Sequence, residues 1–258
     1  MRRASWRRSK RMTIHSDRRN GQPTLRHRAA SRFLALGLFS AFAFTLSSPV
    51  MAASCGSTPE PALDWSECSK KNLMLSASEL EGANLAGTDF SLTDLSGSNL
   101  ASANLEKATL VRAWLAGAKA EKANFGHVEA YRSSFANIIA NGASFVGAEL
   151  QRTDMSGAQL SGADFSKAEL GRVNFKGAVL TGAKFSVANL SRANFNGVTF
   201  EGPIDFEEAF MFLTHIEGVD LSAATGLHQT QIDLTCGDES TKLPEGLKTP
   251  TTWPCASD

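Results

Sequence analysis

The sequence predicts an all-β solenoid whose coils have four sides, and three observations lead to this fold class. Between Leu75 and Gly226, a Leu or Phe recurs about every five residues, two places after a small residue. This period fits neither an α-helix nor a flat strand, and it is typical of a wall that turns a corner in every unit. In one column the large residue is Phe at intervals of 20, which sets four units per coil: Phe125, Phe145, Phe165 and Phe185.

The first element is a basic leader followed by an apolar run. Residues 1–32 hold 11 Lys+Arg and one acid, a charge of +10, whereas residues 33–258 hold 15 Lys+Arg and 25 acids, a charge of −10. The apolar run covers residues 33–46, and small residues follow it. This order is typical of a secretory signal. We therefore expect a signal peptide over residues 1–52, cleavage after Ala52, and a periplasmic or secreted mature protein without stable membrane insertion.

Alternatives for the leader remain open. With its small flanking residues, the apolar run approaches the ~20 residues that a spanning helix needs, so an uncleaved anchor is the second interpretation. Cys55 follows a short run of small residues that only weakly resembles a lipoprotein signal. Translation could begin at Met1 or at Met12.

A pair of cysteines lies at each end of the repeats, in an N-terminal cap over residues 53–74 and a C-terminal cap over residues 227–258. All four cysteines follow the leader, and none lies inside the repeats. In an oxidising compartment an even number of locally paired cysteines predicts disulfides. We expect the pairs Cys55–Cys68 and Cys236–Cys255, because their spacing does not suit zinc ligands.

The repeat units resemble those of the pentapeptide-repeat family throughout residues 75–226. The motif Ala-[Asp/Asn]-[Leu/Phe] appears as ANL at 83–85, 103–105 and 188–190, as ADF at 163–165, and as ANF at 123–125 and 193–195. This resemblance implies a right-handed quadrilateral parallel β-helix, in which the small and large residues point inward and the other three point outward. The C-terminal segment resembles a family extension that has a short helix, near residues 228–235, and a Pro-rich tail.

Opposite columns of the interior are expected to match. A second column of long side chains, offset by ten residues, should face the Phe column: Phe135, Met155, Phe175 and Phe195. Three units have Ala in place of the large residue, at positions 120, 130 and 140. We expect a thinner core or a bulge there, an irregular register over residues 137–141, and the lowest local stability.

One outward column consists of arginine at intervals of 20 without exception: Arg112, Arg132, Arg152, Arg172 and Arg192. These residues, here called the arginine ladder, should stack on one edge of the coils. The favoured interpretation is a surface ion-pair ladder with Glu129, Glu149 and Glu169, which lie three residues earlier. The alternative is a strip for an anionic partner, since Arg presents a planar fork to carboxylate or phosphate. Arg112 and Arg192 have no matching Glu, so they should be the ones available to a ligand.

Trp114 and Tyr131 also take outward positions near this edge. They could anchor a partner, but the favoured interpretation is that they cover the weak core around residues 120–140.

The sequence contains no pattern that indicates chemistry. The histidines have no metal-ligand spacing, no Gly-rich phosphate loop is present, and we expect no catalytic residues, cofactor or metal. The leading hypothesis is an exported, non-catalytic scaffold or binding protein of the cell envelope, a monomer with no nucleic-acid partner, whose partner is a protein or an anionic envelope component.

Two alternatives to this hypothesis remain. The first is an acidic DNA mimic that protects a topoisomerase, as some family members do, which the export signal and the arginine ladder disfavour. The second is a binder of an anionic envelope polymer or lipid headgroup along the arginine edge.

Overall fold

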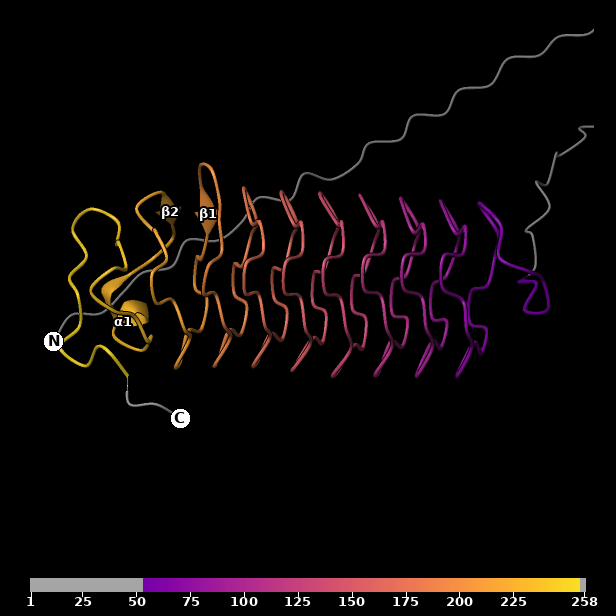
Figure 1. Cartoon of the computed structure of the whole chain (residues 1–258), viewed down its shortest axis with the longest axis horizontal. Helices are drawn as coiled ribbons and strands as arrows, with labels where there is room; N and C mark the ends of the chain where they lie inside the picture. The colour runs from indigo at the N-terminus through magenta and orange to yellow at the C-terminus, as the bar shows by residue number, and fades with distance from the viewer. Residues whose placement is uncertain (1–52, 256–258) are drawn as a thin grey trace, which may run out of the picture. The chain divides into compact units, whose positions relative to one another are not determined.

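The computed structural model describes residues 53–255, and the predictions about the leader concern residues outside this range. Residues 53–255 form a stack of coils along one axis, closed at the C-terminal end by an irregular segment with one short helix (Figure 1). The predicted all-β character thus holds for the coils, whose backbone pairs in parallel from one coil to the next.

Each coil has four walls. In each wall one residue forms a parallel β-bridge with the residue at the same place in the next coil, and we call this the bridged position. The bridges join residues 20 apart, from Asp64 with Asn84 to Val179 with Thr199. We number the walls by inward residues of one coil: wall 1 holds Phe145, wall 2 Leu150, wall 3 Met155 and wall 4 Leu160. Hydrogen bonds between coils accompany the bridges; for example, the Phe125 amide donates to the Ser144 carbonyl at 2.7 Å.

The corners depend on a left-handed backbone conformation two residues after each inward Leu or Phe. Glycine takes this position at many corners, such as Gly162 with φ of 69°, because it has no Cβ to clash. At the bridged position an Asp or Asn often supports the corner by accepting a hydrogen bond from the amide two residues later. The carboxylate of Asp154 accepts from the Ser156 amide at 3.1 Å in this way.

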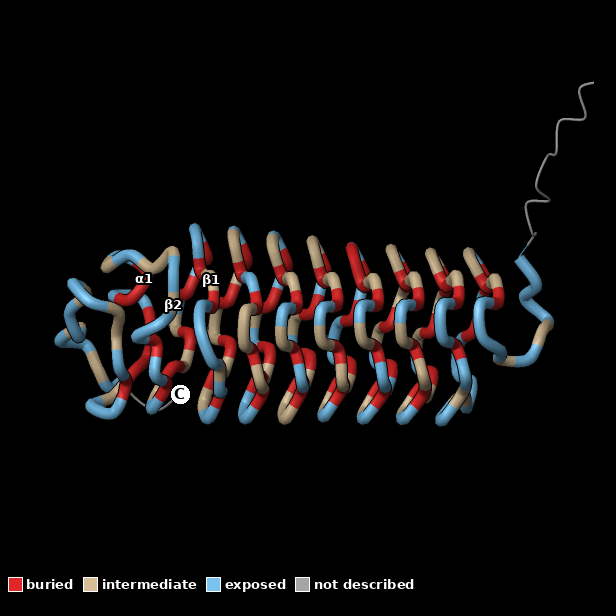
Figure 2. The backbone as a smooth tube through the Cα atoms, turned by 90° about the horizontal axis from the view of Figure 1, so that it is seen from above, coloured by how far each residue is buried: buried red, intermediate tan, exposed pale blue. Residues whose placement is uncertain are grey.

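The interior is a continuous apolar column, buried along the whole stack (Figure 2). The rings of Phe125, Phe145, Phe165 and Phe185 stack with centroid distances of 4.8, 4.7 and 5.1 Å. Phe135 meets Phe125 edge-on at 5.8 Å, so the expectation that the two Phe columns face each other is confirmed.

The bulge expected around residues 120–140 is absent, and that prediction was wrong. The bridges run without interruption from Lys119 to Ile139 and from Ile139 to Gln159. All three alanines are fully buried, as are Val128 and Ile138, which take the inward position usually held by a smaller residue. These two larger side chains occupy space that the missing Leu side chains leave, so the register has no reason to break.

The coil register begins earlier than residue 75. Asp64 already bridges to Asn84, and Trp65 occupies the inward position of wall 1 with 1% exposure. Lys70 takes the next inward position, where its Nζ donates to the Cys55 carbonyl at 2.7 Å and lies 3.6 Å from the centroid of the Trp65 ring. The segment 53–74 therefore contains a first coil that has Trp and Lys where later coils have Leu or Phe.

Near the C-terminal end an extra residue at the Pro203 turn lengthens the spacing of the bridges to 21, as in the bridge of Lys184 to Asp205. Strand β1 (Ile204–Asp205) pairs in parallel with β2 (Ala224–Thr225). Helix α1 (Gln229–Ile232) follows, shorter than the helix expected near 228–235. Its buried Gln231 donates to the carbonyls of Phe206 and Ala209, both at 2.9 Å, and so closes the end of the last coils.

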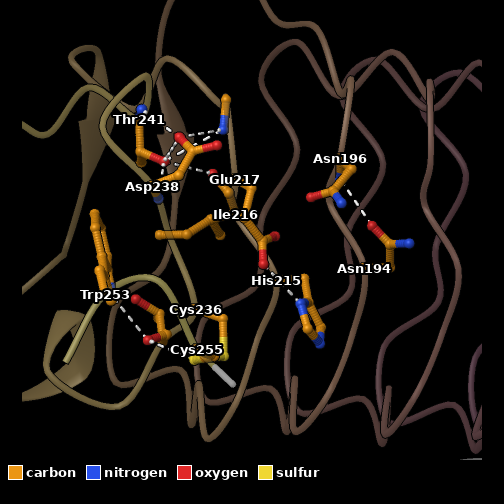
Figure 3. A network of polar contacts seen from close by, with 12 residues as sticks. Asn194, Asn196, His215, Ile216, Glu217, Cys236, Asp238, Thr241, Trp253 and Cys255 are labelled. Carbon is orange, nitrogen blue, oxygen red and sulfur yellow. Dashed lines mark hydrogen bonds and ion pairs between the residues drawn. A yellow bond between two sulfur atoms is a disulfide. The ribbon is translucent and has the colours of Figure 1, made fainter. Parts of the chain in front are cut away.

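Both predicted disulfides are present. Cys55 and Cys68 have a Cα–Cα distance of 5.5 Å, and Cys236 and Cys255 one of 5.3 Å. At the C-terminal cap the Trp253 indole donates to the Thr235 carbonyl at 2.8 Å, beside the second disulfide (Figure 3). Disulfides at both ends of the stack indicate an oxidising compartment.

A candidate binding edge

The arginine ladder lies on one edge, at the corner between walls 2 and 3. Each of its residues has the left-handed corner conformation, with φ between 55° and 60°. Successive rungs belong to successive coils, because the Arg152 amide donates to the Gly171 carbonyl and the Arg172 amide to the Ser191 carbonyl. The rungs are therefore about 4.8 Å apart, the spacing of paired strands.

The ladder holds every arginine of residues 53–258, whereas all ten lysines of that range lie elsewhere. The backbone does not require this choice. Lys107, Lys122 and Lys167 occupy other corners with the same conformation, at φ of 58°, 58° and 62°. The selection of guanidinium over ammonium at one edge therefore needs a reason other than the fold.

The favoured interpretation of an ion-pair ladder was wrong for Arg132, Arg152 and Arg172, the three rungs that have a matching Glu. Among the residues that the structure describes, no carboxylate oxygen lies within 4.0 Å of the guanidinium nitrogens of Arg112, Arg132, Arg152 or Arg172. The glutamates sit at the bridged positions in the middle of wall 2, while the arginines lie at its corner. Arg132 instead lies 5.1 Å from the centroid of the Tyr131 ring. Arg192 does have an interaction, so the expectation that it is available was also wrong.

Two shallow, open hollows follow the ladder and share Arg152. One lies on the wall 2 side, where Gly171 and Ser191 leave space beside three arginines. The other lies on the wall 3 side, beside Trp114, Ser134 and Asp154. An extended ligand along this edge could thus contact guanidinium groups from either wall.

Trp114 and Tyr131 take the outward positions expected for them and are 47% and 38% exposed. Further apolar residues, not predicted from the sequence, lie at the other end of the edge, where Phe210 and Phe212 are 51% and 43% exposed. The shifted register after Pro203 places both at outward positions, which is the signal that could have revealed them. Of the nine exposed large hydrophobic residues within residues 53–255, all but Val187 lie on this edge or the flanking walls: Leu73, Met74, Leu92, Trp114, Tyr131, Phe210, Phe212 and Leu234.

Polar clusters elsewhere in the described residues do not form a metal site. Residues 53–255 contain no group of three His, Cys, Asp or Glu side chains placed to hold a metal ion. His215 contacts Glu217 at 2.9 Å near the C-terminal cap (Figure 3). His127 occupies an exposed corner. In the same range no helix has the length and apolar character that crossing a membrane requires.

Solved structures similar to this chain include two pentapeptide-repeat proteins. HetL, which is involved in heterocyst differentiation regulation in the cyanobacterium Nostoc sp. strain PCC 7120, matches with 20% identity and a TM-score of 0.43, over 75% of this chain and 88% of HetL. QnrB1, a plasmid-mediated fluoroquinolone resistance protein, matches with 20% identity and a TM-score of 0.48, over 72% of this chain and 92% of its own. No curated protein matches the chain significantly.

Family profiles give a more direct assignment. Two profiles described as pentapeptide repeats match this chain, one with nine copies over residues 165–209 and one with eight copies over residues 75–111 and 131–166. These ranges lie within the stacked coils, where the repeat of five residues forms the four walls. The chain belongs to the pentapeptide-repeat family.

Proposed function

We propose that this protein is an exported, non-catalytic binding module of the cell envelope, built on a right-handed quadrilateral β-helix, and that it binds an anionic partner along the arginine ladder. The observation that carries the proposal is the gathering of every arginine of residues 53–258 on one edge, where four of the five have no carboxylate partner in the described residues.

Arginine suits this role better than lysine. Its planar guanidinium can donate two parallel hydrogen bonds to one carboxylate or phosphate and can also stack on an aromatic ring. Stacked cations repel each other when they have no counterion, so the ladder is itself unfavourable for the isolated chain. An anionic partner would remove this repulsion, which gives binding a physical driving force.

The apolar side chains along the same edge support a macromolecular partner. Trp, Tyr and Arg are the residue types that contribute most binding energy in protein interfaces, and Phe and Met are also enriched there. Trp114 and Tyr131 near one end and Phe210 and Phe212 near the other would frame the charged contacts. A protein with acidic side chains is therefore favoured over an anionic polymer or lipid headgroup.

The test is affinity capture from envelope extracts with immobilised residues 53–258. Changing all five ladder arginines to Ser should abolish capture of the partner, and changing them to Lys should weaken it, because charge remains but the fork is lost. A matched control changes Lys107, Lys119, Lys122, Lys167 and Lys184 to Ser, which removes the same charge elsewhere and should leave capture intact. Identical capture by the Arg→Ser variant would show that the ladder is not the binding surface.

Export is tested separately by cell fractionation and mass spectrometry of the full-length protein. We expect to find the protein in the periplasm or the medium, with the mass of a chain that begins at Ala53. A protein that keeps residues 33–46 and sediments with membranes would show that the leader is an anchor, while a cytoplasmic protein of full mass would contradict export.

A further inference from the structure

Wall 2 carries a second row of charge beside the ladder. Glu129, Glu149 and Glu169 occupy the bridged positions in the middle of this wall, each paired to the next through the backbone. We call these three residues the glutamate row. All three are exposed, and the ladder runs parallel to them three residues further along each coil. Wall 2 is the only wall in the described residues with two such rows of opposite sign.

The fold does not account for the glutamate row. At this position an Asp or Asn accepts a hydrogen bond from the amide two residues later, as Asn189 does from Ser191 at 3.1 Å. None of the three glutamates accepts such a bond from its own corner; Glu169 accepts one from the Asn189 side chain at 2.9 Å. Like charges stacked on neighbouring strands are unfavourable, so the row costs the isolated chain stability.

No salt bridge between the two rows is found in the described residues: no ion pair joins a carboxylate of the glutamate row to Arg132, Arg152 or Arg172. The chain thus presents three glutamates and three arginines at matching heights, side by side and not joined to each other by ion pairs. Such a surface is complementary to itself under the right symmetry.

We infer that wall 2 pairs face to face with wall 2 of a second copy, with the two rods parallel and a two-fold axis along the rod between the rows. A half-turn about this axis exchanges the rows at constant height, so that Glu149 of each copy meets Arg152 of the other. The rungs of Glu129 and Glu169 pair in the same way with Arg132 and Arg172. An antiparallel arrangement would set Glu against Glu and Arg against Arg, so charge selects the parallel one.

The apolar end of wall 2 obeys the same symmetry. Phe210 lies in the middle of this wall and Phe212 at its corner with wall 3, with ring centroids 6.4 Å apart and planes within 10°. The half-turn brings the two Phe pairs together and buries apolar surface that is half exposed in one copy. Between the rows, Gly171 is small, whereas Gln151 and the exposed Tyr131 occupy the corresponding places in the two preceding coils.

Self-pairing would cover part of the ladder, so it competes with the anionic partner of the proposed function but does not depend on it. It also differs from the monomer expected from the sequence. The monomer was expected because the C-terminal segment forms a cap, and the cap leaves wall 2 uncovered.

The test is sedimentation equilibrium of residues 53–258 over a range of concentrations, together with two charge-reversed variants. Wild-type protein should form a dimer that weakens as salt rises. The variant E129R/E149R/E169R and the variant R132E/R152E/R172E should each be monomeric alone and form a heterodimer when mixed. Far-UV circular dichroism confirms that each variant is folded. A monomeric wild type, a charge-reversed variant that dimerises as the wild type does, or a mixture that stays monomeric would overturn the inference.

The orientation is tested by single cysteines. Gln151 lies between the two rows, so Q151C should form a cross-link between copies under mild oxidation, whereas the matched S161C on wall 4 should not. Equal cross-linking of both, or of neither, would overturn the parallel pairing of wall 2. The proposed function has its own readout, because E129R/E149R/E169R keeps the whole ladder and should still capture the anionic partner even if no dimer forms.

Discussion

Ile138 shows how a single inward residue decides whether a coil stays regular. The small inward position normally holds Ala, Ser, Thr or Val, and Ile138 is larger than any of these. It lies fully buried two residues before Ala140, in a region where alanine replaces the large inward residues. Since the side-chain volume is redistributed between two inward positions, the backbone pairing needs no adjustment.

The stacked phenylalanines are the residues with the largest expected effect on stability. Phe165 lies between Phe145 and Phe185, at centroid distances of 4.7 and 5.1 Å, and is fully buried. Phe165→Ala should lower the free energy of unfolding by about 3–5 kcal/mol, because it opens a cavity in an interior that cannot collapse without breaking the coil register. Denaturant unfolding measures this change.

The control for Phe165→Ala is Trp114→Ala, which removes a larger aromatic residue that is 47% exposed. That change should cost about 1 kcal/mol or less. Similar losses from both variants would contradict the role of the interior stack.

At the scale of elements, the C-terminal cap is held by polar contacts as well as by its disulfide. Lys242 bridges through the backbone to Asp220 of the preceding coil, and its Nζ lies 2.8 Å from the Asp220 carboxylate. This contact and the hydrogen bonds from Ser222 lower the pKa of Asp220 to about 2. The same pair raises the pKa of Lys242 above its usual value.

These shifts predict how the cap responds to pH. Because the pKa of Asp220 is lower in the folded state, its contribution to stability is present above the usual value of 3.8 and is lost as the pH falls towards about 2. The contribution of Lys242 has the opposite sense, since its pKa is raised: it is present below 10.5 and is lost as the pH rises through the higher folded value.

We therefore expect Asp220→Asn to remove part of the loss in melting temperature that the wild type shows between about pH 4 and pH 2. Thermal melts over this range measure the effect. Lys248→Ala, which changes an exposed lysine of the same cap, is the matched control and should follow the wild type. If Asp220→Asn and the wild type lose melting temperature in parallel, Asp220 does not contribute as stated.

At the scale of the whole molecule, the solenoid is a sum of coils in which each contacts only its neighbours. Deleting 20 residues, Ser156–Phe175, removes one coil and leaves every wall in register, including the four remaining rungs of the ladder. The variant should fold with the same circular dichroism spectrum and melt a few degrees lower.

Deleting only five residues, Ser156–Leu160, is the informative counterpart. It moves each later unit by one wall. Phe residues after the deletion then stack on Leu residues before it, and the ladder is divided between two edges. A much larger loss of melting temperature is expected, because interior stacks no longer continue. Equal melting temperatures for the two deletions would contradict the four-sided register.

The proposed pairing of two copies through wall 2 is also a property of the whole molecule, because only a stack of coils creates the two charged rows. A single glutamate or arginine on an exposed surface contributes little. Three of each at a constant spacing of about 4.8 Å can pair together, and their effects then combine.

Much of the architecture results from the same local residue pattern repeated at a fixed interval, and this part can be predicted from the sequence alone. The five-residue period, the 20-residue columns, the facing Phe stacks and the column of arginines all follow from it, because each unit makes the same turn and meets the unit 20 residues away. The disulfides were also predictable, since each joins cysteines close in the chain.

The remaining features depend on distances between side chains that no periodic pattern contains. Trp65 and Lys70 occupy inward positions without matching the repeat, because the end of a stack can accept an indole and an ammonium that reaches a free carbonyl. Whether the ladder pairs with its glutamates depended on the separation of their charged groups, and no glutamate carboxylate of the row lies within 4.0 Å of the guanidinium nitrogens of Arg132, Arg152 or Arg172. Only folding in three dimensions sets that separation, and it leaves two charged rows open to a partner.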